Sequence, residues 1–385
     1  MRCTKVVIAS ERSERSNLLG ARRLLRRPVC GGTPRNDVLY GVILAGGQGQ
    51  RLWPVSRKKF PKYLISVGGT KRNLLQQSFD RLRKVASADK IFVVTQKAQA
   101  SLIRKNLREL PEKNIIKEPF RRNTAAAIGL AAVTIGRLSP DAVMVIVPAD
   151  QFIPQKDKFA KIIKDAAAVA CSNNSLVTIG VKPTRPATGY GYIKTGYRVQ
   201  GIGFRGYKVA KFVEKPDTAT AKKFIKKGYL WNSGMFVWEI TAILEALRDY
   251  TPDLCKGLIK IEAKKAKLHQ MYEKFNNISI DNAVLEKADN VYVVPADLKW
   301  DDVGSWVSLT RLLNKNKSEN IVDANFKGID TERCIVISKD KKHLIATYGL
   351  KDVVIIKTPD VTLVCSKDKA ENIRELVNVS DYCFR

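Results

Sequence analysis

The sequence predicts an α/β protein with a doubly wound sheet, followed by a small β-rich domain. Three observations predict this fold class. Short apolar runs alternate with helical patterns in the front half of the chain, as they do in βα units around a parallel sheet. The first apolar run ends in a cluster of glycines. After about residue 320, short strand-like segments separated by turns replace the helical patterns, which is typical of a separate β-domain.

The elements of the front half follow from these patterns. Strands are expected at 38–45, 91–95 and 142–147, and helices at 74–83, 97–107 and 124–138. Asn73 and Asn123 are the expected N-caps of the first and last of these helices. Two later segments, 188–193 and 209–214, predict strands added in antiparallel orientation, so the sheet is expected to be mixed.

The last part of the chain predicts a different architecture. Short strands are expected at 334–338, 344–346, 353–357 and 361–365, and a closing helix at 370–377. Regular spacing of short strands indicates a small β-domain, and a solenoid-like stack similar to a left-handed β-helix is one form that it could take, although no strict repeat period is visible. We therefore divide the chain into a basic extension at 1–37, a main domain at 38–318 and a β-rich domain at 319–385. The extension is expected to be disordered or to reflect a start codon placed too far upstream.

Composition excludes several classes of protein. No apolar run approaches the roughly 20 residues that span a bilayer, so no transmembrane helix is expected. Seven dispersed cysteines indicate reduced thiols in a cytoplasmic protein. Only two histidines are present, which excludes histidine metal clusters and histidine-based triads. A net charge of +31 raises the hypothesis of nucleic-acid binding. However, the lysines are spread along the chain, and a preference for small anions or a lysine-biased composition explains them more simply.

The glycine cluster is the most informative motif. Gly46, Gly47 and Gly49 follow an apolar strand, and Arg51 comes next. Such a turn exposes backbone N–H groups that can hold a polyphosphate, with the arginine supplying charge. The spacing fits neither a P-loop, which ends in Gly-Lys-Ser/Thr, nor a dinucleotide fingerprint, which needs a glycine in place of Leu52. The alternative interpretation is an ordinary strand-to-helix turn.

Carboxylates and cations follow at positions where ligands of such sheets gather. Asp150 comes directly after an expected central strand, and Asp302 lies in a later Trp-Asp-Asp segment. Two such carboxylates bind Mg²⁺ well once a triphosphate completes the coordination. Pro61 fixes the backbone before Lys62. Glu214 and Lys215 end another strand and offer an acceptor for hydroxyls and a cation for phosphate; a solvated strand end is the alternative for that pair.

These motifs, taken together, resemble the bacterial mannose-1-phosphate guanylyltransferases of the sugar-1-phosphate nucleotidyltransferase superfamily. The resemblance covers the chain from about residue 38 onward. The motifs that carry it, in this order, are 44–54 with Pro61-Lys62, 118–119 with 122–125, 148–150, 188–193, 212–217, 231–236, 279–287 and 302–306.

The resemblance implies a Rossmann-like nucleotidyltransferase fold and a function. The enzyme would transfer GMP from GTP to α-D-mannose 1-phosphate in a Mg²⁺-dependent reaction, giving GDP-mannose and pyrophosphate for polysaccharide biosynthesis. It implies catalytic roles for Arg51 and Lys62 and a metal site at Asp150 and Asp302. Nucleotide binding is implied for Leu44, Ala45, Gly46, Gly47, Gly49, Arg122, Asn123, Thr124 and Asp150. Sugar-phosphate binding is implied for Gly191, Glu214, Lys215, Asn232 and Asp281.

Other interpretations stay open at this stage. The same chemistry could serve another nucleotide or sugar, such as glucose 1-phosphate, or the chain could be a non-catalytic regulatory homologue. GTP and mannose 1-phosphate are the expected partners. Binding to nucleic acid or to a membrane is not expected, and the chain could form a homodimer. No isomerase activity is expected, because the chain ends before a cupin-like domain. Residues that depart from the family pattern are Gln48, Gln50, Tyr63, Arg121, Gln151 and Ala187.

Overall fold

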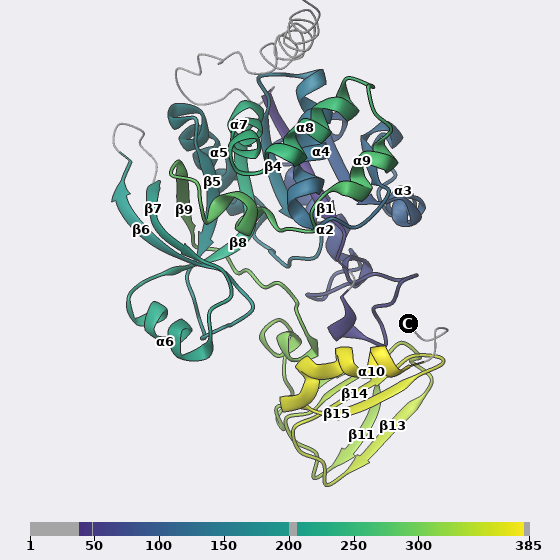
Figure 1. The fold of residues 1–385 in the computed structure, drawn as a ribbon. Helices are drawn as coiled ribbons and strands as arrows, with labels where there is room; N and C mark the ends of the chain where they lie inside the picture. Colours follow the sequence, from purple (N-terminus) through teal and green to yellow (C-terminus); the bar gives the residue numbers. More distant parts are fainter. Residues whose placement is uncertain (1–37, 48, 200–205, 381–385) are drawn as a thin grey trace, which may run out of the picture. The chain divides into compact units, whose positions relative to one another are not determined.

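The computed structural model describes residues 38–47, 49–199 and 206–380 (Figure 1). The predicted extension at 1–37 and Gln48 lie outside the described residues. The chain forms two compact units, each built from three segments. Among the described residues, unit 1 holds those up to Leu44, Arg81–Pro148 and Lys156–Leu298, and unit 2 holds Ala45–Asp80, Ala149–Gln155 and those from Lys299 onward. The predicted division into 38–318 and 319–385 stays a prediction.

The main sheet is nine-stranded, in the order β3-β2-β1-β4-β8-β5-β9-β7-β6. Its strands are β1 Leu39–Ala45, β2 Ile91–Gln96, β3 Ile115–Glu118, β4 Val143–Pro148, β5 Leu176–Val181, β6 Tyr192–Arg198, β7 Tyr207–Val213, β8 Leu230–Glu239 and β9 Val291–Ala296. β1 pairs with β4 and β2 with β3 in parallel, whereas β8 runs antiparallel to β4 and β5. The predicted mixed sheet is thus confirmed.

Helices supply the covering layers of unit 1. They are α3 Ala100–Asn106, α4 Asn123–Leu138, α5 Lys156–Asn173, α6 Thr218–Lys226, α7 Ile240–Tyr250, α8 Pro252–Glu262 and α9 Leu268–Lys274, whereas α2 Leu74–Leu82 lies mostly in unit 2. α4 is rich in alanine and glycine and buried along most of its length, so its neighbours approach closely. A side chain at Gly129 would begin 2.4 Å from Cδ1 of Leu258 on α8. Small residues are therefore required where α4 meets α8.

Two local predictions need correction. Asn73 does cap its helix, because its Oδ1 accepts from the N–H of Gln76 at 2.9 Å. Asn123 does not: the N-cap of α4 is Arg122, and Asn123 is the first helical residue, with φ 62°. In that conformation its Oδ1 accepts from the adjacent N–H of Thr124 instead. The strand expected at 188–193 begins only at Tyr192, because two glycines shape a turn before it.

The β-rich part of unit 2 is a stack of short coils. Its strands are β10 Ile321–Asp323, β11 Asn325–Ile329, β12 Ile335–Ser338, β13 Leu344–Tyr348, β14 Val353–Lys357 and β15 Thr362–Ser366. Asn325 pairs with Leu344 and Ile335 with Val354, both in parallel, so these coils stack directly on one another, whereas β15 runs antiparallel to β14. The predicted closing helix is split into a 3₁₀ turn, η9 Lys367–Asn372, and α10 Ile373–Val379.

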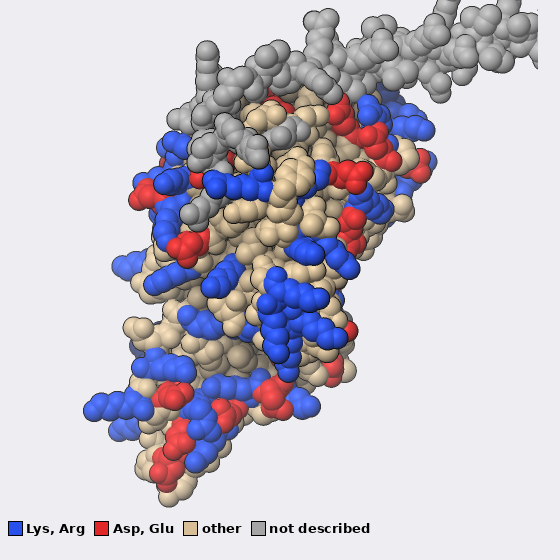
Figure 2. Space-filling view, turned by 90° about the vertical axis from the view of Figure 1, so that its left-hand side faces the viewer, with Lys and Arg blue, Asp and Glu red and all other residues tan. Residues whose placement is uncertain are grey.

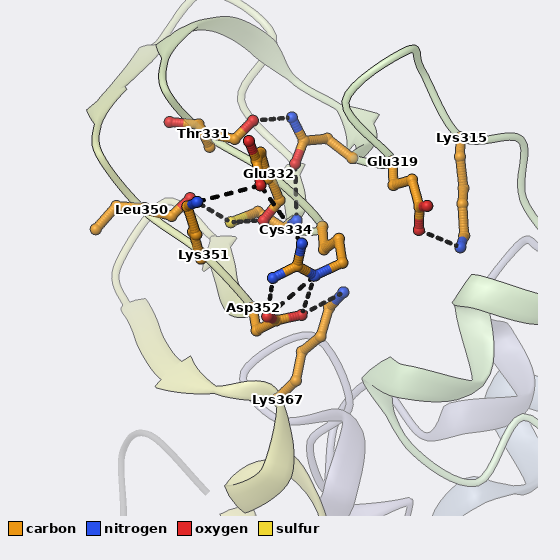
Figure 3. A network of polar contacts seen from close by, with 11 residues as sticks. Lys315, Glu319, Thr331, Glu332, Cys334, Leu350, Lys351, Asp352 and Lys367 are labelled. Atoms are coloured by element: carbon orange, nitrogen blue, oxygen red, sulfur yellow. Dashed lines mark hydrogen bonds and ion pairs between the residues drawn. The ribbon is translucent and has the colours of Figure 1, made fainter.

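A polar network joins the corners of successive coils (Figure 3). Arg333 and Asp352 occupy equivalent corners, both with positive φ, and Nη2 of Arg333 lies 2.6 Å from Oδ2 of Asp352. Lys367 approaches the same carboxylate at 3.9 Å. Beside them, the amide of Asn320 donates to the carbonyl of Thr331 at 2.7 Å. Hydrogen bonds and charge pairs thus hold the turns where apolar packing ends.

Charge and thiols complete the description. Basic side chains form several groups on the face drawn in Figure 2, with acidic side chains interspersed. Within the described residues, Cys171, Cys255, Cys334 and Cys365 are free thiols. None of the helices in this part of the chain is long and apolar enough to cross a membrane.

Candidate active site

The glycine turn and the segment that carries Asp150 directly follow β1 and β4 in the chain. Leu44 on β1 pairs with Pro148 on β4, so the chain leaves both strands at the same edge. A side chain at Gly47 would begin 3.6 Å from Oδ2 of Asp150. Gly49 has φ 63°, and a Cβ there would lie 2.3 Å from Cβ of Lys62. Glycine is therefore needed at 49 both for its left-handed backbone and for the close approach of Lys62.

Lys62 joins the two predicted metal-binding segments. It begins the 3₁₀ turn η3 Lys62–Leu64, after Pro61, and is only 7% exposed. Its Nζ donates to Oδ2 of Asp150 at 2.7 Å and to the main-chain carbonyl of Asp302 at 2.5 Å. One ammonium group thus brings both aspartate-bearing segments together.

The backbone between these segments explains the convergence. Phe152 and Asp301 exchange two main-chain hydrogen bonds of 2.9 and 3.1 Å, which align the segment after β4 with the one before Asp302. Asp301 is buried, and its carboxylate accepts from Nε of Arg311 at 2.6 Å and from the N–H of Val303 at 2.8 Å. The two adjacent aspartates therefore differ: the contacts of Asp301 support the fold, whereas Asp302 is the one predicted as a metal ligand.

The donor set suits a hard divalent cation. Carboxylate oxygens are the ligands that Mg²⁺ prefers, usually one or two together with phosphates and waters. A side chain at Gly304 would begin 2.7 Å from Oδ2 of Asp302, so glycine there leaves room for that carboxylate. The described residues contain no group of three or more His, Cys, Asp or Glu that could hold a metal alone. Asp150 and Asp302 would thus need substrate oxygens to complete a metal site.

Arg51 lies apart from the contacts of Lys62. It sits on the 3₁₀ turn η2 Gln50–Leu52, directly after Gly49, with its side chain 44% exposed. Its Nη1 lies 3.7 Å from Oε2 of Glu371 on η9. Sequence reasoning did not single out Glu371, because it belongs to no motif and lies more than 300 positions away in the chain.

The predicted sugar-phosphate residues gather in unit 1. Asn232 on β8 donates from Nδ2 to Oδ1 of Asp281 at 2.8 Å. A side chain at Gly191 would begin 2.5 Å from Oε2 of Glu214. That oxygen is buried without a hydrogen-bond partner, whereas the other carboxylate oxygen of Glu214 pairs with Nζ of Lys215. Four of the five predicted residues thus form one cluster, and Lys215 is linked to it through Glu214.

The electrostatics of this cluster centre on Asp281. Burial raises the pKa of its carboxyl group to about 6, and the nearby charge of Glu214 adds to the shift. A buried acceptor without a partner beside a carboxyl group of raised pKa is suited to bind a ligand with several hydroxyl groups.

The segment 122–124 packs within unit 1. Arg122 donates from Nε and Nη2 to the carbonyls of Tyr272 and Glu273, at 3.1 and 2.6 Å. Oγ1 of Thr124 accepts from the N–H of Ile280, the residue before Asp281, at 2.8 Å. In this structure the segment therefore supports the end of α9 and the backbone that carries Asp281.

Sequence reasoning missed two residues that contact the predicted motifs, Thr178 and Tyr272. Thr178 on β5 donates from Oγ1 to Oδ1 of Asn232 at 2.8 Å, which fixes the amide so that Nδ2 faces Asp281. Tyr272 donates to Oε1 of Glu118 at 2.6 Å in a buried contact. Burial raises the pKa of Glu118. Neither partner could be found from spacing, since the paired residues are 54 and 154 positions apart.

Comparisons with known proteins define the class. A family model described as nucleotidyl transferase matches residues 40–319, and a model of the MannoseP isomerase/GMP-like beta-helix domain matches residues 325–379. The fold and these matches together define a nucleotidyltransferase with a C-terminal β-helix domain, as the sequence predicted.

The names of similar proteins indicate a narrower class than the family models do. The chain is 35% identical over 360 residues to a mannose-1-phosphate guanylyltransferase of Escherichia coli, covering 90% of this chain and 76% of that protein. It is 36% identical over 353 residues to the xanthan biosynthesis protein XanB of Xanthomonas campestris, covering 89% and 73%. A crystal structure from Thermus thermophilus, described as a mannose-1-phosphate geranyltransferase, matches with a TM-score of 0.81 and 31% identity, covering 89% and 98%. The chain belongs to the nucleotidyl transferase family, in the branch of the mannose-1-phosphate guanylyltransferases.

Proposed function

We propose that this protein transfers GMP from GTP to α-D-mannose 1-phosphate and releases GDP-mannose and pyrophosphate. The position of Lys62 carries the proposal: its Nζ contacts both Asp150 and Asp302 beside the glycine turn. Relatives named for this reaction, 35% identical over 90% of the chain, support the choice of substrates.

The chemistry needs no covalent intermediate on the protein. An oxygen of the sugar phosphate forms a bond to the α-phosphorus of GTP, the bond between that phosphorus and the bridging oxygen breaks, and the electron pair leaves with pyrophosphate. The attacking oxygen is already ionised, so no base is required. Both reactants are polyanions, and catalysis therefore consists mainly of alignment and charge neutralisation.

The residues of the glycine turn and its surroundings are proposed to bind the nucleotide. The backbone of Ala45, Gly46, Gly47 and Gly49 would hold the phosphates, with Leu44 preceding them. Arg51 would neutralise the leaving pyrophosphate, and Lys62 the oxygens around the reacting phosphorus. Arg122, Asn123 and Thr124 are proposed to bind the nucleoside. Arg122 and Thr124 also contact residues 272–280, so the alternative for these two is that they support the site without touching the nucleoside.

Asp150 and Asp302 are proposed to hold Mg²⁺. When bound, the cation would offset the negative charge on the phosphate oxygens. The ammonium group of Lys62 pairs with Asp150 at 2.7 Å and holds that carboxylate in a fixed position beside the glycine turn.

The cluster in unit 1 is proposed to bind the sugar phosphate. The carboxylates of Glu214 and Asp281 would accept hydrogen bonds from the sugar hydroxyl groups, and the amide of Asn232 would donate to them. Gly191 would give the ligand room, and the exposed Lys215 would face its phosphate. We place the reaction in the cytoplasm, where thiols stay reduced, and assign no part in it to nucleic acid.

A pyrophosphate-release assay tests the proposal. The purified chain is incubated with Mg²⁺ and each of four nucleoside triphosphates, crossed with mannose 1-phosphate and glucose 1-phosphate. GTP with mannose 1-phosphate is expected to give the highest kcat/KM. A higher value for another pair would reassign the substrates, and binding of both substrates without turnover would identify a regulatory homologue.

A further inference from the structure

Glu371 connects the β-helix domain to two segments of the proposed phosphate site. It lies on η9, outside the stretch that matches the nucleotidyl transferase model. Its Oε2 lies 3.7 Å from Nη1 of Arg51, and its Oε1 accepts from Oγ of Ser305 at 3.3 Å. One carboxylate therefore contacts the turn behind the glycines and the segment just after Asp302.

Other contacts already join the β-helix domain and the segment after Asp302 to the loop behind the glycines. Arg57 donates to both carboxylate oxygens of Asp360, at 2.6 and 2.8 Å. The indole Nε1 of Trp306 donates to the carbonyl of Trp53 at 2.9 Å. Since a two-pronged ion pair and a buried indole secure the packing, the longer contact of Glu371 is not needed for that purpose.

A hollow beside η2 has a basic lining, in which Arg57 is paired with Asp360. It has a volume of about 170 Å³ and is lined by residues of the loop and of α10, none of them acidic: Gln50, Trp53, Ser56, Arg57, Lys58, Val377 and Asn378. In the described part of the chain, Glu371 is the carboxylate within ion-pair distance of Arg51. It is therefore the anion with which an incoming phosphate would compete for this guanidinium.

The geometry of the pair suits such an exchange. At 3.7 Å the two groups attract each other without a hydrogen bond, and their side chains are 44% and 61% exposed. Pairs of this kind are weak and easily displaced. A pyrophosphate group carries more charge and offers more acceptors to the guanidinium than one carboxylate does.

We propose that Glu371 is a positioning residue, which holds Arg51 in the free enzyme and competes with pyrophosphate for it. The β-helix domain thereby sets how tightly the leaving group is held. This inference rests on the proposed function of Arg51 in binding pyrophosphate.

Two matched substitutions test the proposal. Glu371→Gln removes the charge and keeps an acceptor for Ser305, whereas Glu375→Gln makes the same charge change on the exposed surface of α10. Product inhibition by inorganic pyrophosphate is measured together with kcat and the KM for GTP. Glu371→Gln is expected to tighten inhibition about two- to fivefold, the range of an exposed ion pair. Glu375→Gln is expected to leave it unchanged, with equal thermal midpoints for both variants.

A double substitution separates the effect of Glu371 on Arg51 from a general effect of the lost charge on pyrophosphate binding. In an Arg51→Gln chain, adding Glu371→Gln should no longer change the affinity for pyrophosphate, measured by titration calorimetry. Equal inhibition of the two single variants, or the same gain with and without Arg51, would overturn the proposal. If the wild-type chain turns over no substrate pair, the proposed function fails, and calorimetry with pyrophosphate still decides whether Glu371 opposes its binding.

Discussion

The Nζ of Lys62 lies 2.7 Å from Oδ2 of Asp150, and the lysine is almost fully buried. The same ammonium group also satisfies the main-chain carbonyl of Asp302. A side chain proposed to act on phosphate therefore also ties two segments of unit 2 together. Activity and stability should consequently change together at this position.

Replacing Lys62 by methionine tests this link. The change keeps the length of the side chain but removes the donor, so Asp150 loses its buried partner. We expect kcat to fall by about 10²–10³, the usual effect of losing one preorganised charge. Unfolding in urea should show a loss of about 1–3 kcal/mol, below the full cost of a broken buried pair because Asp150 is partly exposed.

The exposed neighbour Lys59 supplies the control for that experiment. Lys59→Met removes one positive charge three positions earlier and should change neither kcat nor the urea midpoint. Near-normal turnover by Lys62→Met would remove Lys62 from the proposed mechanism.

Two alanine substitutions in the glycine turn should have different effects. At Gly49 the new Cβ would lie 2.3 Å from Cβ of Lys62 and 2.7 Å from Oγ of Ser56, on a left-handed backbone. At Gly46 nothing lies within 4 Å of the new atom. We expect Gly49→Ala to lower the free energy of unfolding by at least about 1 kcal/mol, whereas Gly46→Ala should keep stability and raise the KM for the nucleotide. Thermal melts and steady-state kinetics measure the two effects, and equal melting of both variants would contradict the role of Gly49.

The sequence predicts the central strands and the glycine turn well, because each is specified locally. An apolar run that ends in glycines identifies the end of β1 without knowledge of its neighbours. The cap at Asn123 was wrong because the left-handed φ of that residue redirects its side chain, and no propensity reports this conformation. The contacts of Glu371 with Arg51 and of Thr178 with Asn232 depend on tertiary packing of distant segments. Such partners carry no spacing signal.

The turn before β6 allows a test of the proposed sugar-phosphate cluster. A Cβ at Gly191 would lie 2.5 Å from Oε2 of Glu214, so Gly191→Ala must displace that carboxylate. We expect the KM for the sugar phosphate to rise about tenfold or more, with little change in the KM for the nucleotide. Gly189→Ala is the matched control, since nothing lies within 4 Å of its added atom. An equal rise for both variants would mean that the turn, rather than the Glu214 contact, limits binding.

Asp281 should make the protein less stable as the pH rises from about 4 to 6. Its carboxyl pKa is raised to about 6 by burial and by the charge of Glu214, so the folded chain keeps a proton that the unfolded chain has already lost. Stability from this site is therefore complete below pH 4 and is lost as the pH rises through 6. The loss is at most about 3 kcal/mol, at 1.36 kcal/mol per pKa unit.

Asp281→Asn should remove this dependence, because the amide stays neutral and can still accept from Nδ2 of Asn232. Urea unfolding between pH 4 and 7.5 is expected to show the variant gaining stability over the wild type up to about pH 6, with a constant difference above it. The exposed Asp289, changed to asparagine, removes the same charge outside the cluster and serves as the control. At pH 7.5 the Asp281 variant should also bind mannose 1-phosphate more weakly, because the charged acceptor is lost. A variant that is both more stable and weaker in binding would show that burial of this carboxylate costs stability for the sake of the ligand.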